Sequence, residues 1–209
     1  MERFFEDERN LTMLMDFYEL TMSNGYFVKG LKDQKVVFDM FYRKNPDNGG
    51  FVIFAGLEQF VKYLQNLSFT DRDIEYLRSK NLFCEEFLEY LRNFKFTGDI
   101  YAVEEGTVVY PNTPLVTVVA PLIDAQLIET MLLLTVNHQS LIATKANRIV
   151  RAAGNAKVME FGARRAQGAD GAIYGSRACF PKERPACPAP ACRSLPPLPG
   201  AHGSLTACW

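Results

Sequence analysis

The chain has 209 residues, 48% of them apolar, and carries 23 basic against 24 acidic side chains, a formal net charge of −1. This composition excludes a wholly disordered protein, and the near-zero charge provides no field to attract DNA, RNA or an anionic membrane. No apolar run reaches the roughly 18–20 residues of a membrane span, and the charged residues 1–10 lack the apolar core of a secretory signal. We therefore expect a cytoplasmic protein that binds a small molecule or a soluble partner.

The composition changes sharply near residue 180. Seven of the 11 prolines and three of the five cysteines lie in residues 181–209, which show almost no apolar periodicity. Proline at that density stops helices and central strands, so the sequence predicts a disordered tail. Cys187, Cys192, His202 and Cys208 leave a zinc site as an alternative, although the paired ligand spacing of structural zinc sites is missing.

Residues 1–94 carry helical periodicity interrupted by one strand. Apolar residues recur on one helical face after Asn10, a candidate N-cap, and Asn24-Gly25 is predicted to end that helix. Residues 36–42 are rich in β-branched and aromatic side chains and predict a strand, followed by a loop over residues 45–50. Helical spacing returns over residues 52–66 and 83–94. Thr70 with Asp73 resembles a capping box, which predicts the start of another helix between these two segments.

The pattern then changes to short β-rich runs over residues 98–121, broken by Gly106 and by turn residues 111–114, which predicts a small β-barrel or sandwich. Asp124 is expected to cap a long helix that ends near Ala153. A strand over residues 157–161, a glycine-rich loop over 162–171 and a helix over 172–179 should follow. Helix, strand, loop and helix in this order are typical of a parallel α/β unit, where ligands bind in loops after strands.

The densest polar cluster is residues 160–171, in which Phe161 stands close to Arg164 and Arg165. An aromatic ring beside two guanidinium groups, on a loop after a strand, suits a flat anion. The alternative is a solvated turn whose arginines pair with nearby acids.

Other candidates are weaker when taken singly. Tyr18 lies in the apolar stripe of the first helix near Asp16, and it is either functional or a core tyrosine with a satisfied hydroxyl. Arg43 follows the predicted strand, and it either contacts an anion or is a charged residue at the end of an edge strand. His138 is expected to be structural. Ser/His/Asp, Cys/His, Walker and dinucleotide-binding patterns are absent from the sequence.

Four strings together resemble the nicotinate phosphoribosyltransferase family, and they occur in family order: MDFYELTM (15–22), FAGLE (54–58), IATKANRI (142–149) and EFGARRAQ (160–167). The resemblance implies an enzyme of NAD salvage. The family joins nicotinate to phosphoribosyl pyrophosphate, gives nicotinate mononucleotide and pyrophosphate, couples ATP hydrolysis to the reaction and requires Mg²⁺. Its members combine an amino-terminal domain with an irregular α/β barrel and usually act as homodimers with shared sites.

The resemblance also implies roles for single residues. Tyr18 would contact the nicotinate ring, reaching into the partner subunit's site, with Asp16 nearby. Phe161 would stack on the pyridine, and Arg164 with Arg165 would face the carboxylate or the phosphates. Arg43 matches an arginine that related phosphoribosyltransferases direct at phosphate, a further substrate-binding position.

The match ends at about residue 180. The phosphorylated histidine of the family lies beyond it, so no catalytic residue is assigned, and residues 181–209 resemble coding sequence read in another frame. We therefore expect a truncated, inactive family member: an α+β amino-terminal domain with a β-barrel-like segment (1–122), the start of an incomplete TIM-like α/β barrel (123–180) and a disordered proline-rich tail (181–209). The alternatives are a non-catalytic fragment that pairs with an intact subunit, a nicotinamide-specific relative, and a carrier module built on residues 98–121.

Overall fold

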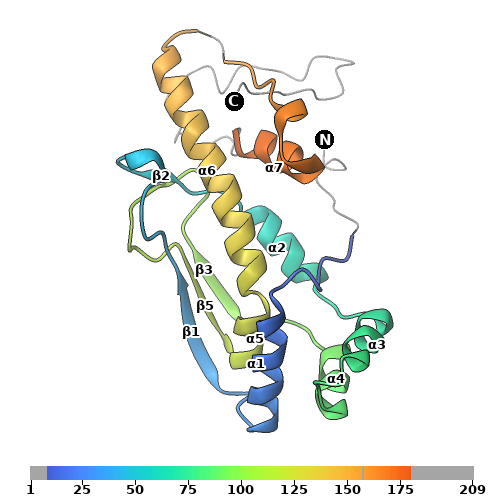
Figure 1. Ribbon diagram of the computed structural model, residues 1–209. Coiled ribbons are helices and arrows are strands. Elements are labelled where there is room, and N and C mark those ends of the chain that lie inside the picture. Colours follow the sequence, from blue (N-terminus) through green and yellow to red (C-terminus); the bar gives the residue numbers. More distant parts are fainter. Residues whose placement is uncertain (1–8, 157, 180–209) are drawn as a thin grey trace. The chain divides into compact units, whose positions relative to one another are not determined.

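The computed structural model describes residues 9–156 and 158–179 (Figure 1). The chain divides into two compact units that interleave along the sequence. The first takes Met1–Met40, Glu58–Ala102 and Val116–Leu134, and the second takes Phe41–Leu57, Val103–Leu115 and Thr135–Trp209. The domain boundaries at residues 122 and 180 stay predictions. The disordered tail and its zinc alternative concern residues outside the described part of the chain.

The first unit contains a three-stranded antiparallel sheet in the order β1 (Lys35–Met40), β5 (Val116–Pro121), β3 (Asp99–Ala102). In the central strand β5, buried and half-buried positions alternate, as expected for a strand with one face on the core. Val119 lies opposite both Val37 and Asp99, so one register serves both pairings. The predicted strand over residues 36–42 is therefore confirmed with slightly different ends.

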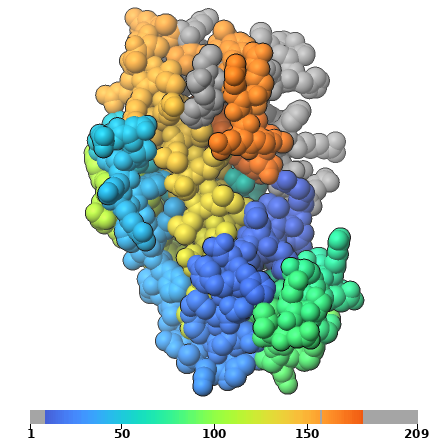
Figure 2. All heavy atoms as spheres, viewed as in Figure 1, coloured from blue at the N-terminus to red at the C-terminus, as the bar shows by residue number. Residues whose placement is uncertain are grey.

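Five helices complete the first unit: α1 (Phe17–Val28), α2 (Leu57–Asn66), α3 (Asp71–Ser79), α4 (Glu85–Arg92) and α5 (Leu122–Leu127). Figure 2 shows α1 against the surface formed by α3 and α4, where the rings of Phe17 and Phe83 meet edge to face at 5.9 Å. Phe60 and Phe87 are fully buried, and each stabilises this core by about 1.5–3 kcal/mol. The capping box at Thr70 and Asp73 is confirmed.

Both predicted ends of the first helix were wrong. Asn10 caps no helix, because its Oδ1 accepts the Thr12 N–H at 2.9 Å in a local turn, and α1 begins only after Asp16. At the other end the helix continues through Gly25 to Val28. It stops where Gly30 takes a positive φ of 71° and the Leu31 N–H bonds to the Tyr26 carbonyl, a Schellman motif.

The second unit is built around the long helix α6 (Glu129–Ala153), from residue 135 onward, with α7 (Gly168–Cys179) and short 3₁₀ turns at Pro46–Asn48 and Ala163–Arg165. Strand β2 (Val52–Ile53) pairs with β4 (Val108–Val109) on one edge. On its other edge, hydroxyls of α6 replace a strand. Ser140 Oγ accepts from Ala55 N at 2.9 Å, and Thr144 Oγ1 accepts from Ile53 N at 2.8 Å.

Several sequence predictions need correction. The strands of residues 98–121 form no closed barrel in the described part, because β3 joins β5 and β1 in one sheet whereas β4 pairs with β2 in another. Residues 158–161 form no strand, since no described neighbour offers them a ladder of hydrogen bonds. The start of a TIM-like α/β barrel is therefore not seen, and what the described residues show is an α+β fold.

Two helix starts were also misplaced. Residues 52–66 begin as β2 and become helical only at Leu57. Asp124 does not cap the long helix, because it lies inside the separate helix α5, where its buried carboxylate accepts from the backbone N–H and the hydroxyl of Thr97 at 2.9 and 3.0 Å. Within residues 9–156 and 158–179, no helix combines the length and apolar character that crossing a bilayer requires.

Candidate functional site

The turn that follows α6 in the sequence presents an aromatic ring and two guanidinium groups to solvent. Residues Ala163–Arg165 form a 3₁₀ turn in which the Arg165 N–H bonds to the Gly162 carbonyl at 2.7 Å. Phe161 is 45% exposed, and Arg164 and Arg165 are exposed as well. Neither arginine forms an ion pair with any residue of the described part, so the alternative of arginines paired with nearby acids finds no partner there.

A buried carboxylate lies at the base of this turn. Glu160 is only 8% exposed, and its Oε1 accepts the Gly162 N–H at 3.1 Å while its Oε2 accepts a long bond from Ser176 Oγ at 3.5 Å. Burial raises the pKa of Glu160, although the two hydrogen bonds oppose the shift. Both bonds come from within the same unit and join the turn to α7.

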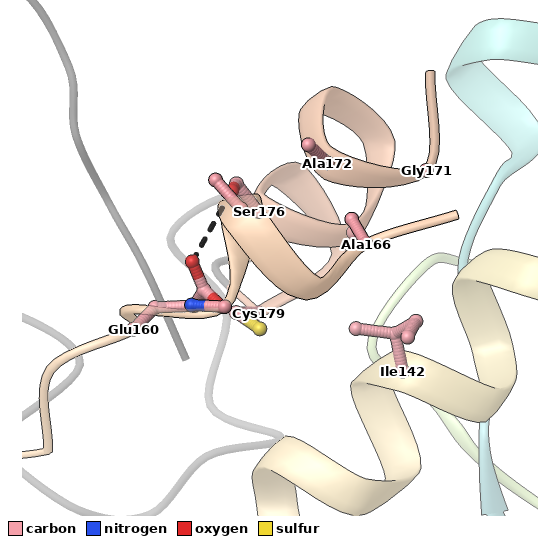
Figure 3. Close-up of a pocket in the computed structure, with 10 residues that line it drawn as sticks. Ile142, Glu160, Ala166, Gly171, Ala172, Ser176 and Cys179 are labelled. Carbon is pink, nitrogen blue, oxygen red and sulfur yellow. Dashed lines mark hydrogen bonds between the residues drawn. The ribbon is translucent and has the colours of Figure 1, made fainter. Parts of the chain in front are cut away.

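Glu160 and Ser176 also border a small pocket of about 20 Å³ that opens to solvent (Figure 3). Its other walls come from small residues of the turn and of α7, from Ile142 on α6 and from Cys179. Burial and the neighbouring Glu160 raise the pKa of the Cys179 thiol to about 12, so this cysteine is a neutral, unreactive thiol at physiological pH.

Helix α7 is held in place by a largely buried ion pair, whose side chains are 12% and 14% exposed. Arg177 Nη2 lies 2.8 Å from Glu105 Oε2, and its Nη1 donates to Gln139 Oε1 at 2.7 Å. Glu105 also accepts the Gly56 N–H at 2.7 Å. Gly56 has a φ of 109°, and a Cβ there would lie 2.7 Å from the Thr135 carbonyl, so the glycine of the FAGLE string is required by the backbone.

In the first unit, Asp16 and Tyr18 stand at the start of α1. Asp16 is the N-cap residue, and its N–H donates to Thr130 Oγ1 at 3.2 Å. Tyr18 is 44% exposed, and its hydroxyl donates to Glu129. Partial burial and the neighbouring carboxylates of Glu129, Glu19 and Asp16 raise the pKa of Tyr18 to about 12. The hydroxyl is therefore satisfied, as in the core interpretation, but the ring remains accessible.

Glu19 is a buried carboxylate next to Tyr18 that the sequence analysis missed. It is fully buried, and its Oε1 accepts both the N–H and the hydroxyl of Thr130, at 3.0 and 2.5 Å. Since Thr130 Oγ1 also accepts from Asp16 N, this relay fixes the start of α1. Burial raises the pKa of Glu19 to about 7, and its Oε2 has no partner among the described residues, like the buried hydroxyls of Ser23 and Tyr63. A charged residue inside an apolar stripe was the available signal.

The remaining candidates lie apart from these features. Arg43 belongs to the second unit, is exposed and forms no ion pair with the described residues. His138 is half-buried on α6, and burial lowers its pKa, in line with its expected structural role. In the described part, no group of three or more His, Cys, Asp or Glu residues could hold a metal ion. The structure thus groups Phe161, Arg164 and Arg165 on one turn, and it assigns Asp16 with Tyr18 to the other unit.

Residues 13–137 match the family model of the nicotinate phosphoribosyltransferase (NAPRTase) N-terminal domain. The chain belongs to the nicotinate phosphoribosyltransferase family. It is 44% identical over 180 residues to nicotinate phosphoribosyltransferase of Bacillus subtilis, which covers 86% of this chain and 36% of that protein. It is 44% identical over 171 residues to nicotinate phosphoribosyltransferase 1 of Arabidopsis thaliana, covering 80% and 31%.

The fold agrees with this membership. The crystal structure of human nicotinic acid phosphoribosyltransferase matches with a TM-score of 0.74 at 35% identity, over 79% of this chain and 34% of that one. The family is one of transferases of NAD biosynthesis, as the sequence resemblance implied. The chain spans about a third of the length of the curated relatives it matches.

Proposed function

We propose that the protein acts on nicotinate and phosphoribosyl pyrophosphate, giving nicotinate mononucleotide and pyrophosphate, with ATP hydrolysis coupled to the reaction. The observation that carries this proposal is the turn of Phe161, Arg164 and Arg165, with its exposed ring and its two guanidinium groups free of acidic partners in the described part. A pyridine carboxylate offers a flat ring for stacking and two oxygens for a guanidinium fork.

In the proposed reaction, the pyridine nitrogen of nicotinate forms a bond to C1 of the ribose. The bond from C1 to the pyrophosphate oxygen breaks, and pyrophosphate leaves with the electron pair through an oxocarbenium-like transition state. Phe161 would orient the ring, and Arg164 and Arg165 would hold the carboxylate or the phosphates. Arg43 would contact phosphate. Catalysis would rest mainly on stabilising charge that develops on the leaving group.

Tyr18 and Asp16 complete the proposed substrate contacts, with Tyr18 reaching the site of the partner subunit in a homodimer. The exposed apolar side chains of this region support pairing through it, since Leu14, Tyr18 and Met22 are each more than 40% exposed. The same surface suits the alternative of a non-catalytic chain that pairs with a longer subunit. Co-purification with an intact family member separates the two.

Mg²⁺ and ATP enter the proposal through the family alone. The described residues offer no cluster of three or more acidic, His or Cys ligands, and the proposed roles of the described residues involve no direct bond to a metal ion. In enzymes of phosphate esters, Mg²⁺ is commonly held by substrate phosphates and water, where it neutralises charge. Nicotinate is favoured over nicotinamide because the four sequence strings and the relatives in Bacillus subtilis and Arabidopsis thaliana belong to nicotinate phosphoribosyltransferases. Two guanidinium groups that form no ion pair with the described residues also suit a carboxylate.

The test is product formation by the purified chain, given nicotinate, phosphoribosyl pyrophosphate and Mg²⁺, with and without ATP. Nicotinate mononucleotide above the level of a Tyr18→Phe/Arg164→Ala control supports the full reaction. Nicotinate binding without product assigns the described residues to base recognition alone and favours the pairing alternative. A folded chain that neither binds nicotinate nor makes product contradicts the proposal.

A further inference from the structure

A buried carboxylate links the turn that presents Phe161, Arg164 and Arg165 to helix α7. The side chains of Arg164 and Arg165 form no hydrogen bond with another described residue, and the ring of Phe161 is 45% exposed. Glu160, directly before them, is buried and bonds both to the turn and to α7 (Figure 3). The residues expected to meet the substrate are therefore exposed, and the residue that fixes their backbone is not.

Glu160 holds the chain at Gly162, whose N–H donates to Glu160 Oε1 at 3.1 Å and whose carbonyl accepts the Arg165 N–H at 2.7 Å. The two bonds lie on the two peptide planes that meet at the Gly162 Cα: the Phe161–Gly162 peptide donates to the carboxylate, and the Gly162–Ala163 peptide closes the 3₁₀ turn. Loss of the carboxylate would free the first plane to rotate, which would redirect Phe161 and the start of the turn that carries Arg164.

Ser176 extends the same hold to α7. Its hydroxyl donates to Glu160 Oε2 over 3.5 Å, a longer and weaker bond than the one from Gly162. Helix α7 is itself fixed by the largely buried pair of Arg177 and Glu105. A chain of contacts therefore runs from this ion pair through α7 and Glu160 to the exposed turn, entirely within the second unit.

A carboxylate is a costly choice for this place. Removing its charge from water is unfavourable, and an apolar side chain of similar volume would avoid that penalty. The surroundings in the pocket are small, mainly glycine and alanine, and they offer the carboxylate no cation. What Glu160 supplies there, and an apolar residue would not, is an acceptor for the Gly162 N–H and for the Ser176 hydroxyl.

We propose that Glu160 is a positioning residue that holds the turn of Phe161, Arg164 and Arg165 in the arrangement that binds a pyridine carboxylate. It acts through the Gly162 N–H, on the peptide that joins Phe161 to Gly162, and does not itself contact the substrate. This inference rests on the proposed function for the identity of the ligand. Its structural part, that the turn is ordered by Glu160, stands on the hydrogen bonds alone.

The experiment compares Glu160→Ala, Glu160→Gln and Ser176→Ala with the unmodified chain, with Glu86→Ala on the exposed face of α4 as the matched control. Amide hydrogen exchange of residues 161–166 reports the order of the turn without any ligand. Calorimetric titration with nicotinate reports recognition. Exchange in α6 serves as the internal standard that shows whether the second unit is folded.

We expect exchange in the turn of Glu160→Ala to rise by about tenfold and its Kd for nicotinate to rise by about tenfold, since a hydrogen bond to a charged group is lost. Glu160→Gln keeps an acceptor oxygen for Gly162 and should restore both values to within about threefold of the unmodified chain. Ser176→Ala removes the longer bond to Glu160 and keeps the bond from Gly162, so it should fall between them. Where Glu160→Ala disrupts α6, the contrast between Glu160→Gln and Ser176→Ala decides.

Three results would overturn the inference. Turn exchange in Glu160→Ala equal to that of the Glu86→Ala control shows that Glu160 orders nothing. Unchanged nicotinate affinity in Glu160→Ala, with the unmodified chain binding well, removes the link to recognition and leaves the proposed function intact. Glu160→Gln as defective as Glu160→Ala shows that the charge itself acts. If the unmodified chain binds no nicotinate, the proposed function fails and the ligand assigned here fails with it.

Discussion

Glu19 provides a quantitative prediction because its protonation is tied to the folding of the first unit. Its carboxyl is fully buried, and burial raises its pKa from 4.5 to about 7. The folded protein therefore keeps a proton, between these two values, that the unfolded chain has lost. The sign follows from linkage: the free energy of unfolding falls as pH rises through this window.

The magnitude follows from the width of the window. Each pH unit over which the proton is retained corresponds to about 1.4 kcal/mol, so the charged form of Glu19 destabilises the fold by about 3 kcal/mol above pH 7. Glu19→Gln removes the ionisation and keeps an acceptor oxygen for Thr130. Relative to the unmodified chain, this variant should gain about 2–3 kcal/mol of stability between pH 5 and pH 8.

The assay is urea unfolding followed by circular dichroism at several pH values between 5 and 8. The difference between variant and unmodified chain is the quantity to compare, because His138, whose lowered pKa gives the opposite slope, cancels from it. Glu86→Gln, at an exposed position of α4, is the matched control. A Glu19→Gln variant that is less stable at pH 8, or whose difference does not vary with pH, would refute the assigned burial.

Two further predictions concern the second unit. Arg177→Met leaves the Glu105 carboxylate buried without its charge partner and should lower the free energy of unfolding by about 3 kcal/mol, with partial recovery in the Arg177→Met/Glu105→Gln double variant, as measured by urea unfolding. Ser140→Ala leaves the Ala55 N–H and carbonyl without their hydroxyl and should cost about 1–3 kcal/mol, whereas Ser79→Ala on the exposed end of α3 should change little in the same assay. A Ser140→Ala variant as stable as Ser79→Ala would mean that water replaces the hydroxyl.

Local chemistry explains what the sequence could predict of the fold. The capping box of Thr70 and Asp73 needs only four consecutive residues, and it was found where expected. Asn10 failed as a signal because asparagine caps helices and turns by the same hydrogen bond, and only the fold decides which occurs. Residues 158–161 have strand composition but no described partner, and pairing is a property that no single segment carries.

The same distinction applies to the candidate site. The exposed turn of Phe161, Arg164 and Arg165 was visible because its residues are neighbours in the sequence. The ion pair of Arg177 and Glu105 joins residues 72 positions apart, and nothing local announces it. The proposed positioning role of Glu160 depends on the burial of its side chain, and the neighbouring residues in the sequence do not indicate that burial. Sequence reasoning therefore found the groups that face solvent and missed those that hold them.

The central claim is that the arginine turn recognises the carboxylate of nicotinate. The most direct measurement is calorimetric titration of the unmodified chain and of Arg164→Ala with nicotinate and with nicotinamide. The account predicts tighter binding of nicotinate, and a loss of about tenfold or more for nicotinate in Arg164→Ala with little change for nicotinamide. Equal binding of the two ligands by the unmodified chain, or an equal loss of both in the variant, would contradict it.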